Sequence, residues 1–335
     1  MRSGSRRALF AVLVAVSFLV AAVAVVAGVR AGDPARRVTA GAADALPAAR
    51  AERRPTLVFI RSATGGLQAA GQVAVAPLDR PPSRPELAPL RCDRVHFAAG
   101  TGLCLAPGSG FAAGYRAKVF GADLRVRHEL EVAGVPSRAR VAPDGRYGSV
   151  TLFVTGHSYA AAGSFSTETT LIDLARGERI AELEDFTVSR AGKQVTAVDV
   201  NFWGVSFARD SDRFYATMAT GGKTYLIQGS VRERVARVIH ENVECPSLSP
   251  DGTRLAYKRR TGSDERPWRL TVLDLATMRE TPLAELRSVD DQAEWLDDEH
   301  VLYGIDGEIE LVRADGRGRP SRYAARAGSP AVVRW

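Results

Sequence analysis

Three cysteines are the most reactive side chains in the sequence, and two of them lie close together along the chain. Cys92 and Cys104 are separated by eleven residues and flank a short run of strand-forming residues, 94–98. Two adjacent strands joined by a hairpin could bring their Cα atoms within the roughly 4.4–6.8 Å that a disulfide needs. We therefore predict a Cys92–Cys104 disulfide, with two separately buried thiols as the alternative. Cys245 is left over and is expected to be a small, buried apolar residue.

Ser158 lies between two strand-like runs, in a motif that is similar to the one around the nucleophile of serine hydrolases. Residues 156–160 read Gly-His-Ser-Tyr-Ala and match the G-x-S-x-G turn of serine hydrolases except at the last position. That turn must lead into a helix, whereas the next strand-like run of this chain begins near Thr170. We therefore do not predict a catalytic role for Ser158. His157 and Tyr159 remain candidates for ligand contacts from an inter-strand loop.

Acidic side chains gather near the C-terminus. The densest group comprises Asp290, Asp291, Glu294, Asp297, Asp298 and Glu299. Calcium prefers several oxygen ligands, so this group could hold that ion, although a solvated turn is the simpler interpretation. The five histidines are scattered and lack the spacing of a zinc site. We predict neither a metal nor another cofactor.

Strands must position these side chains, because no segment after residue 30 shows a helical period over three turns. β-branched and aromatic residues recur in short runs bounded by turn-forming residues. The runs are residues 57–61, 94–98, 149–154, 213–217, 254–258 and 300–303. Intervals of roughly 40–60 residues are typical of β-propeller blades. The sequence therefore predicts an all-β, six-bladed propeller over residues 55–335.

Two matching turn motifs support this repeat. They are Pro143-Asp144-Gly145 and Pro250-Asp251-Gly252, and each precedes a strand-like run. Proline fixes φ before the bend, aspartate accepts hydrogen bonds from nearby backbone N–H groups, and glycine tolerates a positive φ. Related residues occupy the same place at 208–211 and 296–299. We expect all four segments to form tight turns between strands.

The last residues predict how the ring closes. Residues 333–335 repeat the pattern of residues 293–295, which begin the preceding unit. They therefore resemble the first strand of a blade with no blade behind it. Because unpaired strand edges invite aggregation, we expect residues 331–335 to pair within the blade that contains residues 57–61.

Loops that lead into the innermost strands usually form the ligand face of a propeller. On this chain they are expected to include residues 201–203, 241–244 and 290–292. The candidate ligand contacts there are Trp203, Glu244, Asp290 and Asp291. Trp203 is the first to test, because aromatic anchors supply much of the binding energy at interfaces. Blade packing is the alternative role for Trp203.

The N-terminus predicts a membrane segment. Residues 8–29 carry no charge and, at about 1.5 Å per residue in a helix, would cross a hydrocarbon core of roughly 30 Å. Arg2, Arg6 and Arg7 precede them within a basic leader, residues 1–7, which places the N-terminus in the cytoplasm and the propeller outside. We predict a single-pass protein of the cell membrane. A cleaved signal peptide, and hence a secreted protein, is the alternative.

Residues 30–54 predict a flexible tether, because alanine, arginine, glycine and proline dominate without hydrophobic periodicity. The net charge of +7 belongs mainly to the N-terminus: residues 1–54 hold nine arginines and three acidic residues, for +6. The rest of the chain carries only +1. The basic balance therefore indicates membrane topology and gives no reason to expect a nucleic-acid partner, and we predict none.

Residues 249–257, Ser-Pro-Asp-Gly-Thr-Arg-Leu-Ala-Tyr, closely resemble the repeat of TolB-like six-bladed propellers. Behind an N-terminal membrane segment, the arrangement is similar to that of the TolB-like proteins of actinobacteria. The resemblance implies a propeller fold and an export route, and no catalytic residue, since the repeat residues build turns. We expect a non-catalytic binding or scaffolding module with protein partners in the cell envelope.

An enzyme with its site in the central channel is the alternative function. A metal-dependent lactonase or hydrolase of this kind would bring inward-facing acidic and histidine side chains together on one axis. An apolar or plugged channel would count against that alternative.

Overall fold

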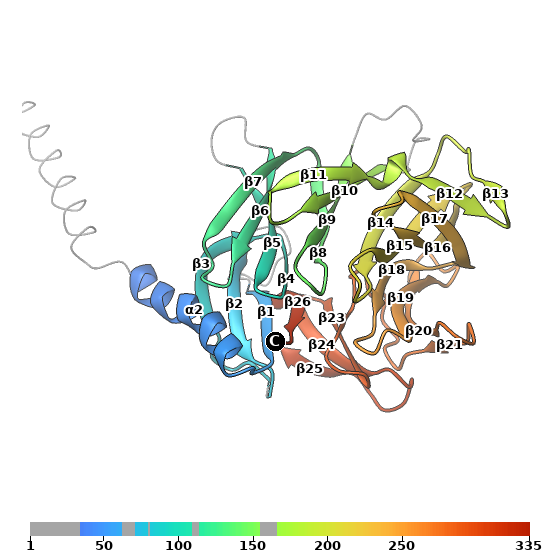
Figure 1. Ribbon diagram of the computed structural model, residues 1–335. Coiled ribbons are helices and arrows are strands. Elements are labelled where there is room, and N and C mark those ends of the chain that lie inside the picture. Colours follow the sequence, from blue (N-terminus) through green and yellow to red (C-terminus); the bar gives the residue numbers. More distant parts are fainter. Residues whose placement is uncertain (1–33, 62–70, 80, 109–113, 155–165) are drawn as a thin grey trace, which may run out of the picture.

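The strand-forming runs fold into six β-sheets arranged as blades of a ring (Figure 1). The computed structural model describes residues 34–61, 71–79, 81–108, 114–154 and 166–335 of the 335-residue chain. In each blade, neighbouring strands of the four-stranded core run antiparallel. The predicted six-bladed propeller is confirmed.

Each blade is built from an innermost strand outwards. Blade 1 comprises β26 (Ala327–Val333), β1 (Thr56–Arg61), β2 (Gly71–Pro77) and β3 (Glu86–Cys92). Blade 2 comprises β4 (Arg94–Ala98), β5 (Thr101–Pro107), β6 (Tyr115–Gly121) and β7 (Val126–Val132). Blade 3 comprises β8 (Val135–Val141), β9 (Tyr147–Val154), β10 (Ser166–Asp173) and β11 (Glu178–Glu182).

The second half of the ring follows the same order. Blade 4 comprises β14 (Asn201–Phe207), β15 (Arg213–Thr220), β16 (Lys223–Ser230) and β17 (Val235–Glu241). It is extended outwards by β12 (Thr187–Arg190) and β13 (Lys193–Gln194), which follow a short 3₁₀ helix, η1 (Leu183–Asp185). Blade 5 comprises β18 (Glu244–Leu248), β19 (Arg254–Arg260), β20 (Trp268–Asp274) and β21 (Glu280–Pro282). Blade 6 comprises β22 (Glu294–Trp295), β23 (His300–Ile305), β24 (Glu308–Arg313) and β25 (Ser321–Ala324).

Burial along the strands follows their position in a blade. The second strand β9 is buried at its first six positions, because both of its faces pack against neighbouring blades. The outermost strand β7 is largely exposed. Five of the six predicted runs are such second strands, whereas residues 94–98 form β4, the innermost strand of blade 2.

The two Pro-Asp-Gly motifs form the turns between the innermost and second strands of blades 3 and 5. Gly252 N–H donates to Ser249 O at 2.9 Å, and Gly145 N–H donates to Ala142 O at 2.8 Å. Both glycines have a positive φ, +77° at Gly252 and +75° at Gly145. Residues other than glycine rarely adopt this backbone conformation. These turns mark what we call the lower end of the channel. The upper end is where the innermost strands begin.

The C-terminal strand closes the ring, as the sequence predicts. β26 pairs antiparallel with β1, with Leu57 opposite Val332 and Val58 opposite Ala331. The strand begins at Ala327, earlier than the predicted residue 331, and ends at Val333. The ring of Trp335 then lies edge-on against Phe97 of blade 2, with centroids 6.0 Å apart.

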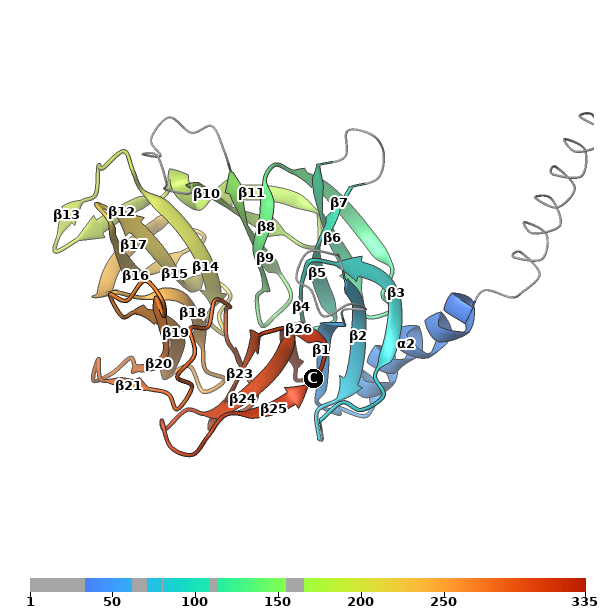
Figure 2. The same ribbon diagram turned by 180° about the vertical axis from the view of Figure 1, so that it is seen from behind.

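The segment expected to be a flexible tether differs in the structure. Residues 34–51 form a helix, α2 (Pro34–Ala51), on the outside of blade 1 beside β2 and β3 (Figure 2). Leu46 and Ala49, three positions apart on one helical face, are buried there. Alanine has the strongest helix propensity, which explains why this alanine-rich segment is helical. The small apolar face of Leu46 and Ala49 then docks the helix on blade 1.

The predicted membrane segment, residues 8–29, lies outside the described residues. In the part of the chain that the structure describes, no helix is both long and apolar enough to cross a bilayer.

The Cys92–Cys104 disulfide is present, with a Cα–Cα distance of 5.6 Å. The two strands involved do not form the hairpin that the spacing of the cysteines suggests. Cys92 ends β3 of blade 1, whereas Cys104 lies in β5 of blade 2, so the bridge joins two neighbouring blades. Cys245 is free and buried.

Candidate functional site

Alternating residues on the innermost strand of blade 3 place two arginines on one face. Arg138 and Arg140 are two positions apart in β8, so both side chains point to the same side of the strand. Only 8% of Arg138 and 7% of Arg140 are exposed. Buried guanidinium groups require partners, and those partners come from other blades.

Arg138 lies in a cluster of charges at the upper end of the channel. Lys258 Nζ, from the end of β19, is 2.6 Å from Asp290 Oδ1, and Arg138 Nη2 is 3.4 Å from the same oxygen. Lys258 also lies 4.2 Å from the centroid of the Trp268 ring, a cation–π contact. The side chain of Lys258 is 4% exposed, whereas that of Asp290 is 62% exposed. The cations are therefore buried while their shared counterion faces solvent.

Arg94 adds a third cation to this upper cluster. Its Nε donates to Ser137 O at 2.7 Å. Burial lowers the pKa of Arg94, and the neighbouring charge of Arg138 lowers it further. Partial loss of water opposes the ionisation of Asp290, but Lys258 and Arg138 nevertheless hold the pKa of Asp290 below its ordinary value. The upper end thus gathers three cations around the accessible carboxylate of Asp290, with the carboxylates of Asp291 and Glu244 nearby.

A second charged group lies deeper in the channel and joins three blades. Arg140 bonds to Glu294 of β22, and its Nη1 lies 2.9 Å from Nε2 of His96 in β4. The other Glu294 oxygen accepts the N–H of Val332 in β26 at 3.1 Å. We call His96, Arg140 and Glu294 the channel triad.

The protonation states of the channel triad follow from its contacts. His96 Nδ1 accepts the Val141 N–H at 3.1 Å, while its Nε2 lies 2.9 Å from Arg140 Nη1 and 3.7 Å from Glu294 Oε2. Burial lowers the pKa of His96, and Arg140 lowers it further. Burial opposes the ionisation of Glu294, but Arg140 and His96 bring its pKa down to about 2. A carboxylate this weakly basic is a poor general base at neutral pH. The triad therefore fastens blades together.

A cavity of about 290 Å³ lies at the lower end of the channel, and the channel triad forms part of its wall. It is lined by residues of the innermost strands and their turns, including Ser206, Ser249, Arg209 and Arg334. Arg209 donates to Pro250 O, and Arg334 donates to Trp295 O at 3.3 Å. Both guanidinium groups thus contribute to holding the turns of this lower end.

The structure brings three of the predicted ligand contacts to the upper end. Asp290 belongs to the upper cluster, and Glu244 is 4.0 Å from Lys258 and bonded to Arg260. Asp291 accepts the Gly304 N–H at 2.8 Å. Trp203 is only 6% exposed within β14, as expected for a packing residue. Whether any of them binds a ligand stays a prediction.

Two further candidates, His157 and Tyr159, lie outside the described residues. Within the described ranges, no group of three His, Cys, Asp or Glu residues is arranged to hold a metal ion.

Sequence reasoning missed the cations of the upper cluster. Arg138, like Arg140, stands within a strand-like run of otherwise small and apolar residues, and Lys258 is one of only four lysines in the chain. A charged residue inside a buried strand indicates that its side chain needs a buried partner. The sequence thus indicates that these cations have buried partners, but it does not identify the partner residues.

Six antiparallel blades around a channel closed by a C-terminal strand define a six-bladed β-propeller. No protein-family model matches the chain, and no curated protein sequence does. Solved structures do match. TolB from Acinetobacter baumannii aligns with a TM-score of 0.54 at 16% identity, over 83% of this chain and 66% of that one. A putative TolB from Agrobacterium tumefaciens aligns at 10% identity over 81% and 88%, with a TM-score of 0.48.

A chain of the nidogen/laminin complex aligns with a TM-score of 0.52 at 10% identity, covering 83% of this chain and 97% of that one. At these identities the similarity concerns the fold alone. The protein is therefore a TolB-like six-bladed propeller in architecture, and it spans 66% of the length of the Acinetobacter TolB chain.

Proposed function

We propose that the protein is a membrane-tethered, extracytoplasmic binding module that holds an envelope protein partner at the upper end of its channel. The observation that carries the proposal is the upper cluster, where Arg94, Arg138 and Lys258 are largely withdrawn from water around Asp290. Charges in such a site interact more strongly with a partner than charges on an open surface do. Asp290 is the exposed member of this cluster, so a partner segment that offers basic or hydrogen-bond-donating side chains fits this arrangement.

The rim of the upper end supports contact with a protein. Leu286, in the connection that leads into β22, is 61% exposed, and Val135, the first residue of β8, is also exposed. Exposed apolar residues beside a charged site are typical of protein interfaces, where an apolar centre is combined with polar contacts.

The cellular location rests on two features of the chain. Residues 8–29 have the length and hydrophobicity of a membrane segment, with arginines on the cytoplasmic side. The Cys92–Cys104 disulfide fits an oxidising compartment outside the cytoplasm. TolB, whose structure has the same fold, gives a precedent for such a propeller in bacteria.

Photo-crosslinking of the full chain in its native cells tests the proposal. A photoreactive residue in place of Leu286 reports on the upper end, and one in place of the exposed Arg319 in blade 6 is the control. We expect a discrete crosslinked partner from the first position only, and a several-fold weaker product when Lys258 is also replaced by methionine. Identical products from both positions, or abundant envelope proteins alone, would contradict a specific binding role.

A channel-centred hydrolase or lactonase is the second candidate. The observation that favours it is the convergence of His96 and Glu294 on the channel. Arg140 contacts both of these residues, however, and so occupies the side chains that such a site would use. Turnover of esters or lactones by the full chain, with and without added calcium, would support this candidate if Glu294→Gln abolished it. Turnover that survives Glu294→Gln would exclude the channel triad as its site.

A further inference from the structure

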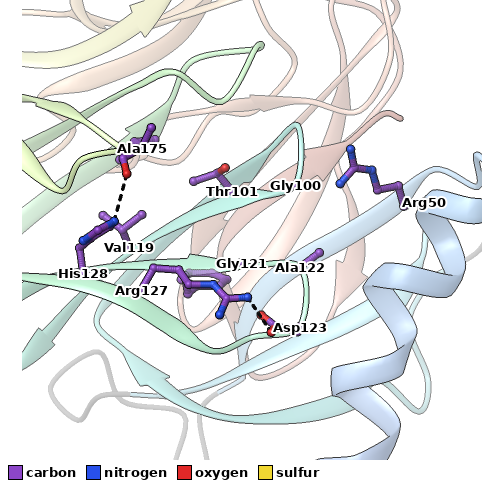
Figure 3. Close-up of a pocket in the computed structure, with 12 residues that line it drawn as sticks. Arg50, Gly100, Thr101, Val119, Gly121, Ala122, Asp123, Arg127, His128 and Ala175 are labelled. Carbon is purple, nitrogen blue, oxygen red and sulfur yellow. Dashed lines mark hydrogen bonds and ion pairs between the residues drawn. The ribbon is translucent and has the colours of Figure 1, made fainter.

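A second cavity, of about 610 Å³, opens on the lower side of blades 2 and 3 and shares no lining residue with the channel cavity; we call it the outer cavity (Figure 3). Helix α2 contributes Arg50, and the turn between β4 and β5 contributes Gly100 and Thr101. The end of β6 and the start of β7 contribute residues 119–123 together with Arg127 and His128. Residues 174–175 of blade 3 complete the wall. Three separate units of the chain therefore build this site.

Positive charge exceeds negative charge around this outer cavity. Asp123 is its one acidic lining residue, and it is shared by two arginines: Arg127 Nη2 is 2.7 Å from Asp123 Oδ2, and Arg125 Nε is 3.9 Å away. Among the described residues, the guanidinium group of Arg50 has neither a hydrogen-bond nor an ion-pair partner. The lining thus offers one free guanidinium group and a second that is only partly neutralised.

The position of Arg50 is determined by packing. Leu46 and Ala49 bury one face of α2 on blade 1, which directs the next residue towards the turn between β4 and β5. A Cβ atom added at Gly100 would lie 3.0 Å from Arg50 Nη1, so the absence of a side chain there leaves room for the guanidinium group. Figure 3 shows Arg50 on one side of the cavity and His128 on the other, with the Arg127–Asp123 pair between them.

We propose that this outer cavity binds a phosphate group between Arg50 and Arg127. Guanidinium groups match the geometry of phosphate oxygens and bind them through paired, charge-assisted hydrogen bonds. The Thr101 hydroxyl and the His128 ring line the same space and offer further polar contacts. His128 Nε2 lies 3.1 Å from Ala175 O, which holds the ring against the wall.

Two sources could supply the phosphate: a soluble phosphomonoester or an anionic lipid headgroup. Only residues 30–33 separate the N-terminal end of α2 from the predicted membrane segment, whereas Arg50 lies about 24 Å further along the helix. A headgroup would therefore reach Arg50 if α2 lay along the bilayer surface. Both sources present the same chemistry to Arg50 and Arg127, and they can be separated by experiment.

The test uses the full chain in phosphatidylcholine nanodiscs, titrated calorimetrically with inorganic phosphate at constant ionic strength. We expect saturable binding that weakens about tenfold in Arg50→Gln and in Arg127→Gln, the effect of losing charge-assisted hydrogen bonds. Arg319→Gln makes the same charge change on blade 6 and is expected to bind like the wild type. Asp123→Asn releases Arg127 and is expected to strengthen binding several-fold.

A second titration, in nanodiscs that contain phosphatidic acid, identifies the source. Competition from this lipid, lost in Arg50→Gln, supports a headgroup, whereas undiminished phosphate binding supports a soluble ligand. Failure of the wild type to bind phosphate in either nanodisc would overturn the proposal. Equal affinities of the Arg50, Arg127 and Arg319 variants, with thermal unfolding unchanged, would overturn it as well.

Discussion

Glu294 and Val332 are 38 positions apart in the sequence, yet Glu294 Oε1 accepts the backbone N–H of Val332 at 3.1 Å. The first residue lies in the innermost strand of blade 6, and the second lies in the strand that closes blade 1. The same carboxylate is bonded to Arg140 of blade 3. One buried side chain therefore links the closing strand to the opposite side of the channel.

Replacing Glu294 with glutamine is expected to destabilise the fold by about 3–5 kcal/mol, because Arg140 would be left as a buried charge without its counterion. The glutamine oxygen can still accept the Val332 N–H, so the change isolates the loss of charge. Chemical denaturation gives the free energy of unfolding. Glu308→Gln, which breaks an exposed pair with Arg322, is the control and should change stability little. Equal effects of the two substitutions would contradict this account.

Acid is expected to remove the stabilising contributions of two channel residues in two stages. The pKa of His96 is lowered from its ordinary 6.5 in the folded state, so unfolded chains take up this proton first and stability falls as the pH drops below about 6.5. The pKa of Glu294 is lowered from 4.5 to about 2, so its contribution is lost as the pH falls from 4.5 through 2. Denaturation midpoints between pH 8 and pH 2, compared with those of His96→Gln and Glu294→Gln, measure both stages.

The first stage of this acid response has a specific control. In His96→Gln the part of the loss between pH 6.5 and pH 5 that belongs to His96 should disappear, while the later stage remains. Identical changes in stability of the wild type and His96→Gln between pH 8 and pH 5 would show that His96 is not held neutral in the fold.

Removing residues 327–335, and with them β26, is expected to abolish cooperative folding. Without this strand β1 has an open edge at the centre of the ring, and Glu294 loses its bond to Val332. Thermal unfolding and size-exclusion chromatography would detect a broad transition and aggregation. Deleting only residues 334–335 leaves the strand pairing intact and should give a milder loss. A cooperative, monomeric protein after the longer deletion would contradict closure by β26.

Substitutions at Gly204 and Gly222 distinguish the cost of a positive φ from the cost of a steric clash. Both have a positive φ, +65° and +72°, but a Cβ atom added at Gly204 would lie 2.6 Å from Cys245 Cα, whereas one at Gly222 would have no atom within 4 Å. Gly222→Ala should therefore cost about 1 kcal/mol, from backbone strain alone. Gly204→Ala should cost about 3 kcal/mol, because β14 and β18 must also move apart. Similar values by chemical denaturation would refute the close approach.

Peptide mapping of the unreduced protein should recover Cys92 and Cys104 as one linked pair. Cys245 is free but buried, so a thiol reagent should label it only after unfolding. Replacing both bridged cysteines with serine is expected to lower stability by about 2–4 kcal/mol, since the unfolded chain gains freedom. Labelling of Cys92 or Cys104 in the native, unreduced protein would disprove the bridge.

The fold could be predicted from the sequence because its signals are local. The turn at Pro250–Gly252 is encoded by residues next to one another, and Trp335 repeats the pattern around Trp295. The channel triad could not be predicted in this way, because Arg140 and Glu294 are 154 positions apart and meet only when the ring closes. Likewise, the docking of α2 depends on where β2 and β3 place an apolar surface for Leu46.

Helix α2, which follows the predicted membrane segment, packs on blade 1, and β26, the strand that closes the ring, is part of the same blade. A force applied to the chain before residue 34 would reach α2 first and β1 next, and β1 is the strand that holds β26. Beyond β3, the covalent bridge from Cys92 to blade 2 would stop the chain from unravelling further between residues 92 and 104. Tension on the chain before residue 34 would therefore open the ring at blade 1, because the force acts on the pairing of β1 with β26 before it reaches any other blade.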